Sequence, residues 1–168
     1  MDYGKKFVDA LLRWELLAES RTDSATKAET FKKSYGGIHV EAAICDKDRY
    51  SFLFSGLRIE SVAGNVSEQR LLVCANRLIS TIDYLTENLA LIEFDQQNGV
   101  VQIRSSKPVP KKDGYHYFEI LFSNKNTCSV HRYQKLASEH SRRRIPVLMT
   151  RDTLERLIDD IIALWLSE

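Results

Sequence analysis

Apolar residues recur at helical spacing in three separate parts of the chain, with polar residues between them. A period of three to four residues is typical of an amphipathic helix that turns one face to the core. Asn65 or Ser67 can cap the second helix, and Thr150 can cap the third. Thr26 and Glu29 fit a capping box, which predicts a short helical segment there. The three main helices are predicted within residues 7–18, 65–88 and 150–165.

Alternating apolar and polar residues predict a series of strands. Ile38, Val40 and Ala42 alternate with His39 and Glu41, which is the pattern of a half-buried strand. The first two strands are expected to form a hairpin, and an Asn-Gly turn is expected between the third and the fourth. The predicted strands cover residues 38–44, 49–62, 89–94, 100–105, 115–123 and 127–137.

Several residues refine this strand assignment. Gly56 predicts a bulge in the second strand. Residues 115–123 are apolar on both faces and are expected in the centre of the sheet, whereas the more polar residues 127–137 are expected at an edge. Two prolines within residues 106–114 oppose regular pairing, so that segment and the arginine-rich residues 138–146 are predicted to be loops.

This pattern predicts an α+β fold, because hairpins alternate with single helices. We expect an antiparallel sheet of about six strands, with the N-terminal, middle and C-terminal helices packed mainly on one face, in the order α-β-β-α-β-β-β-β-α. The chain has 168 residues, of which 43% are apolar and 28% charged, and this composition is ordinary for a globular protein. We therefore expect a single domain over residues 1–168.

The cysteines and the apolar runs indicate a compartment. Three isolated cysteines without CxxC spacing fit neither a disulfide framework nor a zinc site, and they are typical of a reducing cytosol. Charged residues interrupt the apolar ones in the first 20 positions, so no signal peptide is expected. No run approaches the ~18 apolar residues that span a bilayer. We predict a cytoplasmic protein that does not enter a membrane.

The net charge of +1 conceals an uneven distribution of charge. Residues 104–144 contain ten basic and three acidic residues, whereas the remainder contains 14 basic and 20 acidic ones. Basic side chains interleaved with aromatic ones on a sheet can bind single-stranded nucleic acid, because cations neutralise phosphates and rings stack on bases. The predicted basic patch consists of Lys111, Lys112, Arg132, Arg142, Arg143 and Arg144, with Tyr115, Tyr117 and Tyr133 as stacking residues.

The same segment has other interpretations. Basic loops are often only solvated, and the aromatic residues of a central strand usually belong to the core. The basic segment also suits an acidic protein partner, or acidic residues of the last helix such as Asp159 and Asp160. Residues 115–123 lack the glycine-aromatic pattern of RNA-binding sheets.

The sequence contains little that indicates catalysis. The paired glycines at 36–37 precede a strand rather than a helix, which opposes a phosphate-binding glycine loop. His39, Glu41, Asp46 and Asp48 form the best group of metal ligands, but such residues more often make a solvated strand face and a polar turn. The prediction leans against an enzyme and includes no metal and no cofactor.

A cysteine nucleophile is also disfavoured. Cys128 and His131 differ in strand parity, so they are expected to point to opposite faces. A nucleophile and its base must lie within hydrogen-bond reach of each other. This geometry opposes a Cys–His pair.

We therefore expect a non-catalytic cytosolic protein-binding, adaptor or chaperone-like module. Strands that are apolar on both faces leave more apolar surface than one layer of helices covers, which predicts a homodimer or a protein partner bound through the sheet and the basic loops. The element order is similar to that of small α+β secretion chaperones, which implies binding of extended peptides by a dimer. The alternative is a single-stranded nucleic-acid binder using segment 104–144, and a metal-dependent enzyme is the third hypothesis.

Overall fold

The computed structural model describes residues 2–16, 27–112, 114–138 and 140–166. Within them the chain forms three helices, α1 (Tyr3–Arg13), α2 (Glu68–Thr81) and α3 (Arg151–Leu166). Ser67 caps α2 as predicted, because its Oγ accepts a hydrogen bond from Arg70 N at 3.3 Å. Thr150 caps α3 in the same way, with Thr153 N donating to its Oγ1 at 3.3 Å. None of the described helices combines the length and the apolar composition needed to cross a membrane.

Within the described residues, ten strands form one antiparallel sheet. Seven of them follow the order β1-β2-β3-β8-β7-β5-β4, while β6, β9 and β10 pair with β7, β8 and β3, respectively. The strands are β1 (Glu29–Tyr35), β2 (Ile38–Lys47), β3 (Ser51–Ser61), β4 (Leu89–Asp95), β5 (Val100–Ser105), β6 (Val109–Lys111), β7 (Gly114–Ser123), β8 (Thr127–Leu136), β9 (Arg142–Ile145) and β10 (Val147–Thr150).

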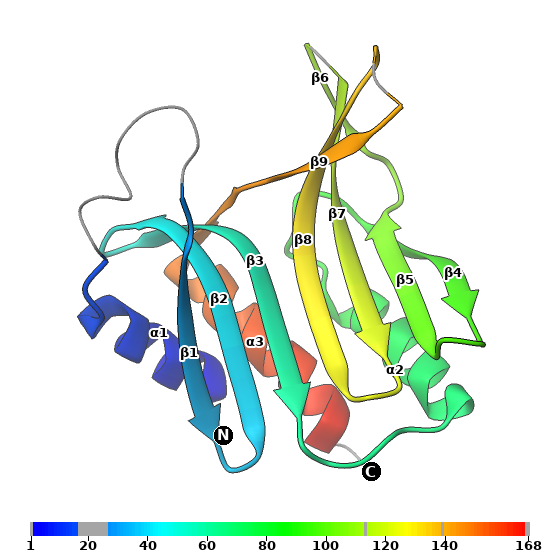
Figure 1. The fold of residues 1–168 in the computed structure, drawn as a ribbon, viewed down its shortest axis with the longest axis horizontal. Coiled ribbons are helices and arrows are strands. Elements are labelled where there is room, and N and C mark those ends of the chain that lie inside the picture. The colour runs from blue at the N-terminus through cyan, green and yellow to red at the C-terminus, as the bar shows by residue number, and fades with distance from the viewer. Residues whose placement is uncertain (1, 17–26, 113, 139, 167–168) are drawn as a thin grey trace.

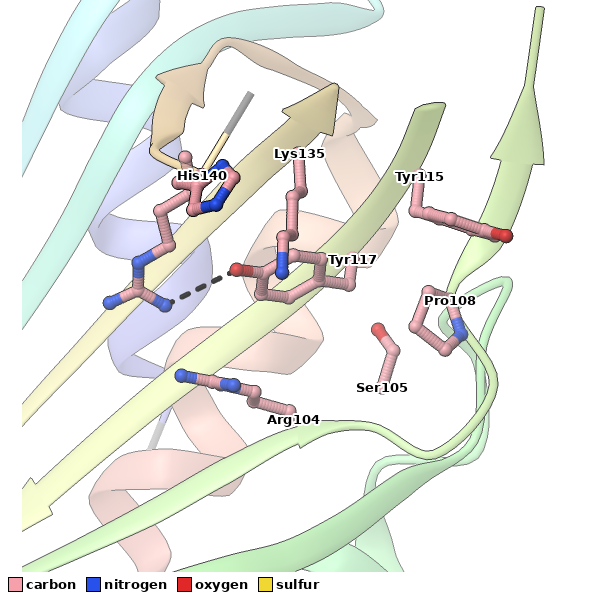
Figure 2. A pocket seen from close by; sticks show the side chains of 8 residues that line it. Arg104, Ser105, Pro108, Tyr115, Tyr117, Lys135 and His140 are labelled. Atoms are coloured by element: carbon pink, nitrogen blue, oxygen red, sulfur yellow. Dashed lines mark hydrogen bonds between the residues drawn. The ribbon is translucent and has the colours of Figure 1, made fainter. Parts of the chain in front are cut away.

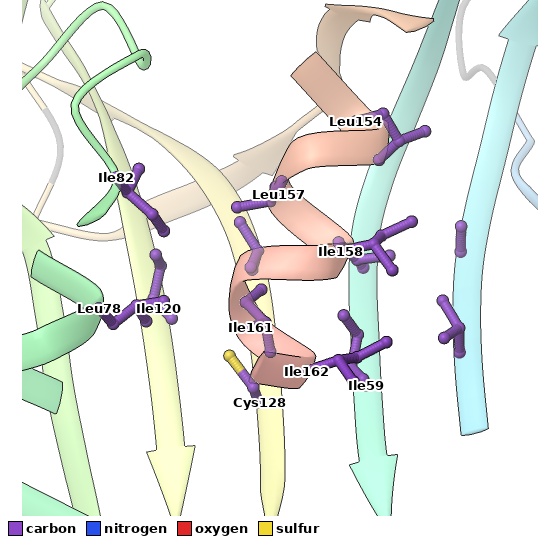
Figure 3. Packing of buried hydrophobic residues seen from close by; sticks show 14 of the residues in the cluster. Ile59, Leu78, Ile82, Ile120, Cys128, Leu154, Leu157, Ile158, Ile161 and Ile162 are labelled. Carbon is purple, nitrogen blue, oxygen red and sulfur yellow. The ribbon is translucent and has the colours of Figure 1, made fainter. Parts of the chain in front are cut away.

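All three helices pack on one face of the sheet, which we call the inner face (Figure 1). No described element covers the opposite, outer face. Figure 3 shows Ile161 of α3 close to Cys128 of β8 and Ile162 close to Ile59 of β3, and all four side chains are fully buried. Burial of such apolar surface is the main favourable term in folding, at about 25 cal/mol per Å². The core therefore lies between the inner face and the helices.

Strands β3 and β8 separate at one end of the sheet, and the segment β9–β10 lies between them. β8 pairs with β3 through residues 127–130 and with β9 through residues 132–135. β3 pairs with β8 through residues 57–60 and with β10 through residues 51–54. The chain passes from β9 to β10 at Pro146, so one continuous segment is hydrogen-bonded to both halves of the sheet.

The fold is α+β and its sheet is antiparallel, but the prediction of about six strands is wrong. The missed strands are β1, β6, β9 and β10. In β1 only Phe31 is buried, so that segment shows no apolar alternation. β6 contains Pro110, which is tolerated because the strand is paired on one side only. β9 carries three arginines and β10 has four residues, and both are defined by backbone pairing rather than by an apolar period.

Two further predictions are corrected by the sheet order. Residues 127–137 are not at an edge, because β8 lies between β3 and β7. Their polar character arises because one side of β8 faces the uncovered outer face. The helical segment predicted at Thr26 and Glu29 is not found at Glu29, which begins β1, and Thr26 lies outside the described residues.

The predicted hairpin and bulge in β2 and β3 are confirmed. Ala43 pairs with Gly56 and Ile44 pairs with Phe54, so Ser55 between them has no partner in the register. The predicted Asn-Gly turn joins β4 and β5, and Gly99 adopts a φ of 60° there. Positive φ values are easily reached by glycine and explain its presence at this turn.

Helix α1 packs directly against α3 at Gly4. A Cβ atom at Gly4 would lie 2.0 Å from the backbone oxygen of Glu155. Gly4 N also donates a hydrogen bond to Asp159 Oδ1 at 2.9 Å. The close approach of the two helices therefore requires glycine at this position.

We expect Gly4→Ala to lower the free energy of unfolding by about 1–3 kcal/mol, because the added methyl group forces the two helices apart. Equilibrium unfolding in urea measures this change. Gly64→Ala is the matched control, since a Cβ at Gly64 meets no atom within 4 Å. Equal stability of the two variants would contradict the proposed close packing.

Candidate functional site

A buried acidic residue lies on the outer face of the sheet. Glu119 is in the middle of β7 and is only 1% exposed. Its neighbours Phe118 and Ile120 belong to the hydrophobic core, so the alternation of the strand turns Glu119 toward the outer face. Burying an unpaired carboxylate costs several kcal/mol. The need to pair Glu119 therefore determines which charged side chains gather on this part of the outer face.

Three polar side chains from β5 and β9 hold the Glu119 carboxylate. Arg104 Nε and Gln102 Nε2 donate to its Oε2 at 2.9 Å and 2.8 Å. Arg142 donates to both carboxylate oxygens, with Nη2 reaching Oε1 at 3.1 Å. These hydrogen bonds raise the pKa of Arg142 above its ordinary value. Two guanidinium groups from separate strands are thus held beside one buried charge.

Two tyrosines lie among these arginines. Tyr117 and Tyr133 are paired across β7 and β8 and stack with ring centroids 5.8 Å apart. The Cζ atoms of Arg142 and Arg144 lie 4.1 Å and 5.9 Å from the Tyr133 centroid. Arg104 Cζ lies 5.5 Å from the Tyr117 centroid. The outer Arg–Tyr cluster is defined as Arg104, Arg142, Arg144, Tyr117, Tyr133 and Glu119.

His131 lies beside this cluster and is paired with Glu119 across β7 and β8. Its ring packs on Gly56 of β3, where a Cβ atom would lie 2.9 Å from His131 Nε2. Burial and the positive charges of Arg144 and Arg142 lower the pKa of His131 to about 4, against the opposing effect of Glu119. The imidazole is therefore neutral at pH 7 and adds no charge to the cluster.

Two adjoining hollows lie where the β6–β7 and β8–β9 hairpins leave the body of the sheet. The first has a volume of about 390 Å³, and Figure 2 shows Arg104 and Lys135 on either side of Tyr117 within it. The second has a volume of about 500 Å³ and shares Tyr115, Lys135 and His140 with the first. Because they share these residues, we treat the two hollows as one feature, the hairpin groove.

The predicted arginines lie on both faces of the sheet. Arg142 and Arg144 are on the outer face, paired with Lys135 and Tyr133 of β8. Arg143 points to the inner side, where its Nε donates to Gln134 Oε1 at 2.7 Å. Consecutive residues of a strand cannot share a face. The run of three arginines is therefore divided between two surfaces.

Arg132 is an internal structural contact. It lies on the inner side of β8, and its Nη2 donates to Glu87 Oε1 at 2.8 Å. Both side chains are largely buried, with exposures of 13% and 2%. The Arg132 guanidinium also lies 4.4 Å from the ring centroid of Phe118. Its charge is compensated within the fold, on the face opposite to Arg142 and Arg144.

The remaining predicted residues differ in exposure. Lys111 ends β6, Lys112 follows it, and both are exposed on the hairpin beside the hairpin groove. Tyr115 is 51% exposed and lines both hollows, whereas Tyr117 is only 7% exposed. Tyr133 is covered by arginines. Of the three predicted stacking residues, Tyr115 therefore offers the most open ring.

The sequence-based site lacked the residues that organise this surface, namely Glu119, Gln102, Arg104 and Lys135. One signal was present: Glu119 is the single charged residue of its strand, and residues 115–122 are otherwise apolar or aromatic. A charge in a central strand requires buried partners. The register that places Arg104 opposite Glu119 was not visible in the sequence.

The candidate catalytic residues have ordinary structural contacts. His39 Nδ1 lies 2.7 Å from Ser34 Oγ, and Glu41 forms an ion pair with Lys32 at 2.7 Å. Within the part of the chain that the structure describes, no three His, Cys, Asp or Glu side chains gather as a metal site. Burial raises the pKa of the Cys128 thiol, which is therefore protonated at neutral pH.

No protein-family model, curated protein or solved structure matches this chain. Function is therefore inferred from the chemistry of the outer Arg–Tyr cluster and the hairpin groove. Fixed cations beside an exposed aromatic ring can bind a ligand that is both anionic and planar.

We expect acid to destabilise the protein through His131. Its pKa is about 6.5 in an unfolded chain and about 4 in the fold, so the unfolded chain binds the proton more tightly. The contribution of the neutral His131 imidazole to the free energy of unfolding is therefore fully present above pH 6.5. As the pH falls from 6.5 to 4, this contribution decreases by about 1–3 kcal/mol. Urea unfolding at several pH values, with an NMR titration of the imidazole, measures both quantities.

His131→Gln should remove this part of the pH dependence, whereas His140→Gln at an exposed loop position should retain it. Other groups also titrate in this range, so the difference between each variant and the parent chain is compared at each pH. An imidazole that titrates near pH 6.5 would contradict the described burial of His131.

Proposed function

We propose that the protein is a non-catalytic binding module that holds single-stranded nucleic acid on its outer face. The observation that supports this most is the outer Arg–Tyr cluster, which concentrates positive charge on the face without helices. Three arginines accompany one carboxylate there, so about two positive charges remain uncompensated within the cluster. Excess cationic charge attracts a phosphate backbone.

The rest of the outer face has a different charge pattern. Lys32 pairs with Glu41 at 2.7 Å, and Arg58 pairs with Glu60 at 3.0 Å. These pairs lie on β1, β2 and β3, away from β5, β7 and β9. The positive charge is therefore confined to one part of the sheet, beside the hairpin groove, rather than spread over a solvated surface.

The shape of the groove also supports an extended, flexible ligand. The two hollows adjoin each other along Tyr115, Lys135 and His140. A single strand can place phosphates on the cations and a base on the exposed Tyr115 ring, which contributes about 1–3 kcal/mol per stacked base. A duplex keeps its bases stacked on each other, so it gains less from this ring.

We expect a fluorescent oligothymidylate to bind at low salt, with affinity falling roughly 20- to 100-fold between 50 and 200 mM salt if about three to five phosphates are contacted. Fluorescence anisotropy measures this dependence. Arg144→Gln should weaken binding and reduce the slope of log affinity against log salt by about 0.7, because one phosphate contact is lost.

Arg58→Gln is the matched control for Arg144→Gln, because Arg58 is also an arginine of the outer face but is paired with Glu60. It should leave the salt slope unchanged. No binding of the oligonucleotide at low salt would overturn the proposed function.

A second candidate is self-association through the edge of the sheet at β4. Leu91 and Ile92 of β4 are 38% and 49% exposed, and Val73 of the adjacent helix α2 is 60% exposed. The opposite edge strand, β1, carries Lys32 and Lys33, which disfavour edge-to-edge pairing. Of these two end strands of the described sheet, β4 is therefore the one that presents apolar side chains to a second copy of the chain.

If β4 forms a homodimer, Ile92→Lys should shift the mass toward that of the monomer, because a charge at the edge opposes strand pairing. Light scattering across a dilution series measures this mass. Val62→Lys replaces another exposed apolar residue, 67% exposed, outside β4 and should leave the mass unchanged. A monomeric parent chain at all concentrations would rule out this candidate.

A further inference from the structure

The first hollow of the hairpin groove carries more positive charge than one backbone phosphate needs. Arg104, Lys135 and Arg142 line it, and no acidic residue of the described chain does so. Asp113 and Glu139, the other acidic residues of segment 104–144, lie outside the described residues. Glu119 forms ion pairs with two of the three cations, Arg104 and Arg142. About two positive charges are therefore left to face the hollow.

The contacts of these cations leave donors available. Arg104 uses Nε for Glu119, so its two terminal nitrogens take no part in that ion pair. Lys135 forms no ion pair with any described residue. Glu119 fixes the Arg104 guanidinium in place before a ligand arrives, which lowers the entropic cost of binding. The hollow thus presents cations in fixed positions.

The size and walls of the hollow limit what can enter with the anion. Its volume of about 390 Å³ is at the lower end of small-molecule sites, which span roughly 300–1,000 Å³. Tyr117 is nearly buried, whereas Tyr115 is half exposed and lies near Pro108 (Figure 2). One open ring and this volume suit a single nucleotide.

The charge distinguishes a terminal phosphate from an internal one. A phosphodiester in the backbone carries one negative charge, whereas a phosphate monoester carries about 1.5 to 2 at pH 7. We infer that this hollow binds a nucleoside phosphate monoester, presented at the end of a single strand or as a free nucleotide. This inference rests on the proposed function and adds recognition of the phosphorylated end.

The test compares oligothymidylates that carry a 5′-phosphate, a 3′-phosphate or hydroxyls at both ends, together with free thymidine monophosphate. Anisotropy competition at pH 7 should show about tenfold tighter binding for an end-phosphorylated strand than for the hydroxyl strand, because one charge-assisted contact is gained. Lys135→Gln should remove this preference without disturbing the fold, since Lys135 is exposed and unpaired among the described residues.

Two further variants complete the test. Arg104→Gln leaves about one positive charge in the hollow and should also abolish the preference, while Gln102 and Arg142 still hold the buried Glu119 carboxylate. Arg58→Gln should retain it. Circular dichroism confirms that each variant is folded.

The outcomes separate the two proposals. If all strands bind equally well, the inference is overturned and the proposed function stands. If no strand binds but thymidine monophosphate does, in a manner that depends on Lys135, the site stands as a nucleotide site and the proposed function is overturned. If neither strands nor nucleotide bind, both are overturned.

Discussion

The charge of Glu119 is the constraint on which the outer face depends. A carboxylate buried to 1% exposure must be paired, and its partners come from β5 and β9 rather than from β8, the other strand of its hairpin. The Arg142 side chain therefore lies over the Tyr133 ring and extends to Glu119. One buried anion of β7 thus connects β5 with β9 and holds two guanidinium groups in fixed positions beside the hairpin groove.

The two faces of the sheet differ in their exposure to water, and their side chains differ accordingly. On the inner face, apolar side chains from three helices and the central strands exclude water, and Arg132 is accommodated there only with Glu87 and the Phe118 ring as partners. On the outer face, charged residues remain near water and either neutralise each other, as Lys32 and Glu41 do, or gather with aromatic rings. The arginines and tyrosines of β5, β7, β8 and β9 form the second kind of surface, and this difference is the basis of the proposed ligand surface.

Local patterns in the sequence were sufficient to predict the elements that bury a regular stripe of apolar side chains. The three helices, the caps at Ser67 and Thr150, and the bulge at Gly56 were predicted, because each depends on residues close together in the chain. The end of the middle helix was not, since α2 ends at Thr81 and not at Asn88. The missed strands β1, β6 and β9 bury little apolar surface of their own, whereas β10 buries Val147 and Met149 but has only four residues. β1, β6 and β9 pair with the neighbouring strand of a hairpin, and β10 pairs with β3, which is distant in the sequence. No regular apolar period in these segments signals their pairing.

The candidate site was likewise predictable from the sequence only in part. The sequence alone determined that positive charge and tyrosines are concentrated in residues 104–144, since composition is independent of folding. Only the tertiary structure decided which of these side chains meet: strand alternation sent Arg132 and Arg143 to one side and Arg142 and Arg144 to the other. The register between β5 and β7 then placed Arg104 opposite Glu119. Register is a long-range property because it is set by the packing of the whole sheet.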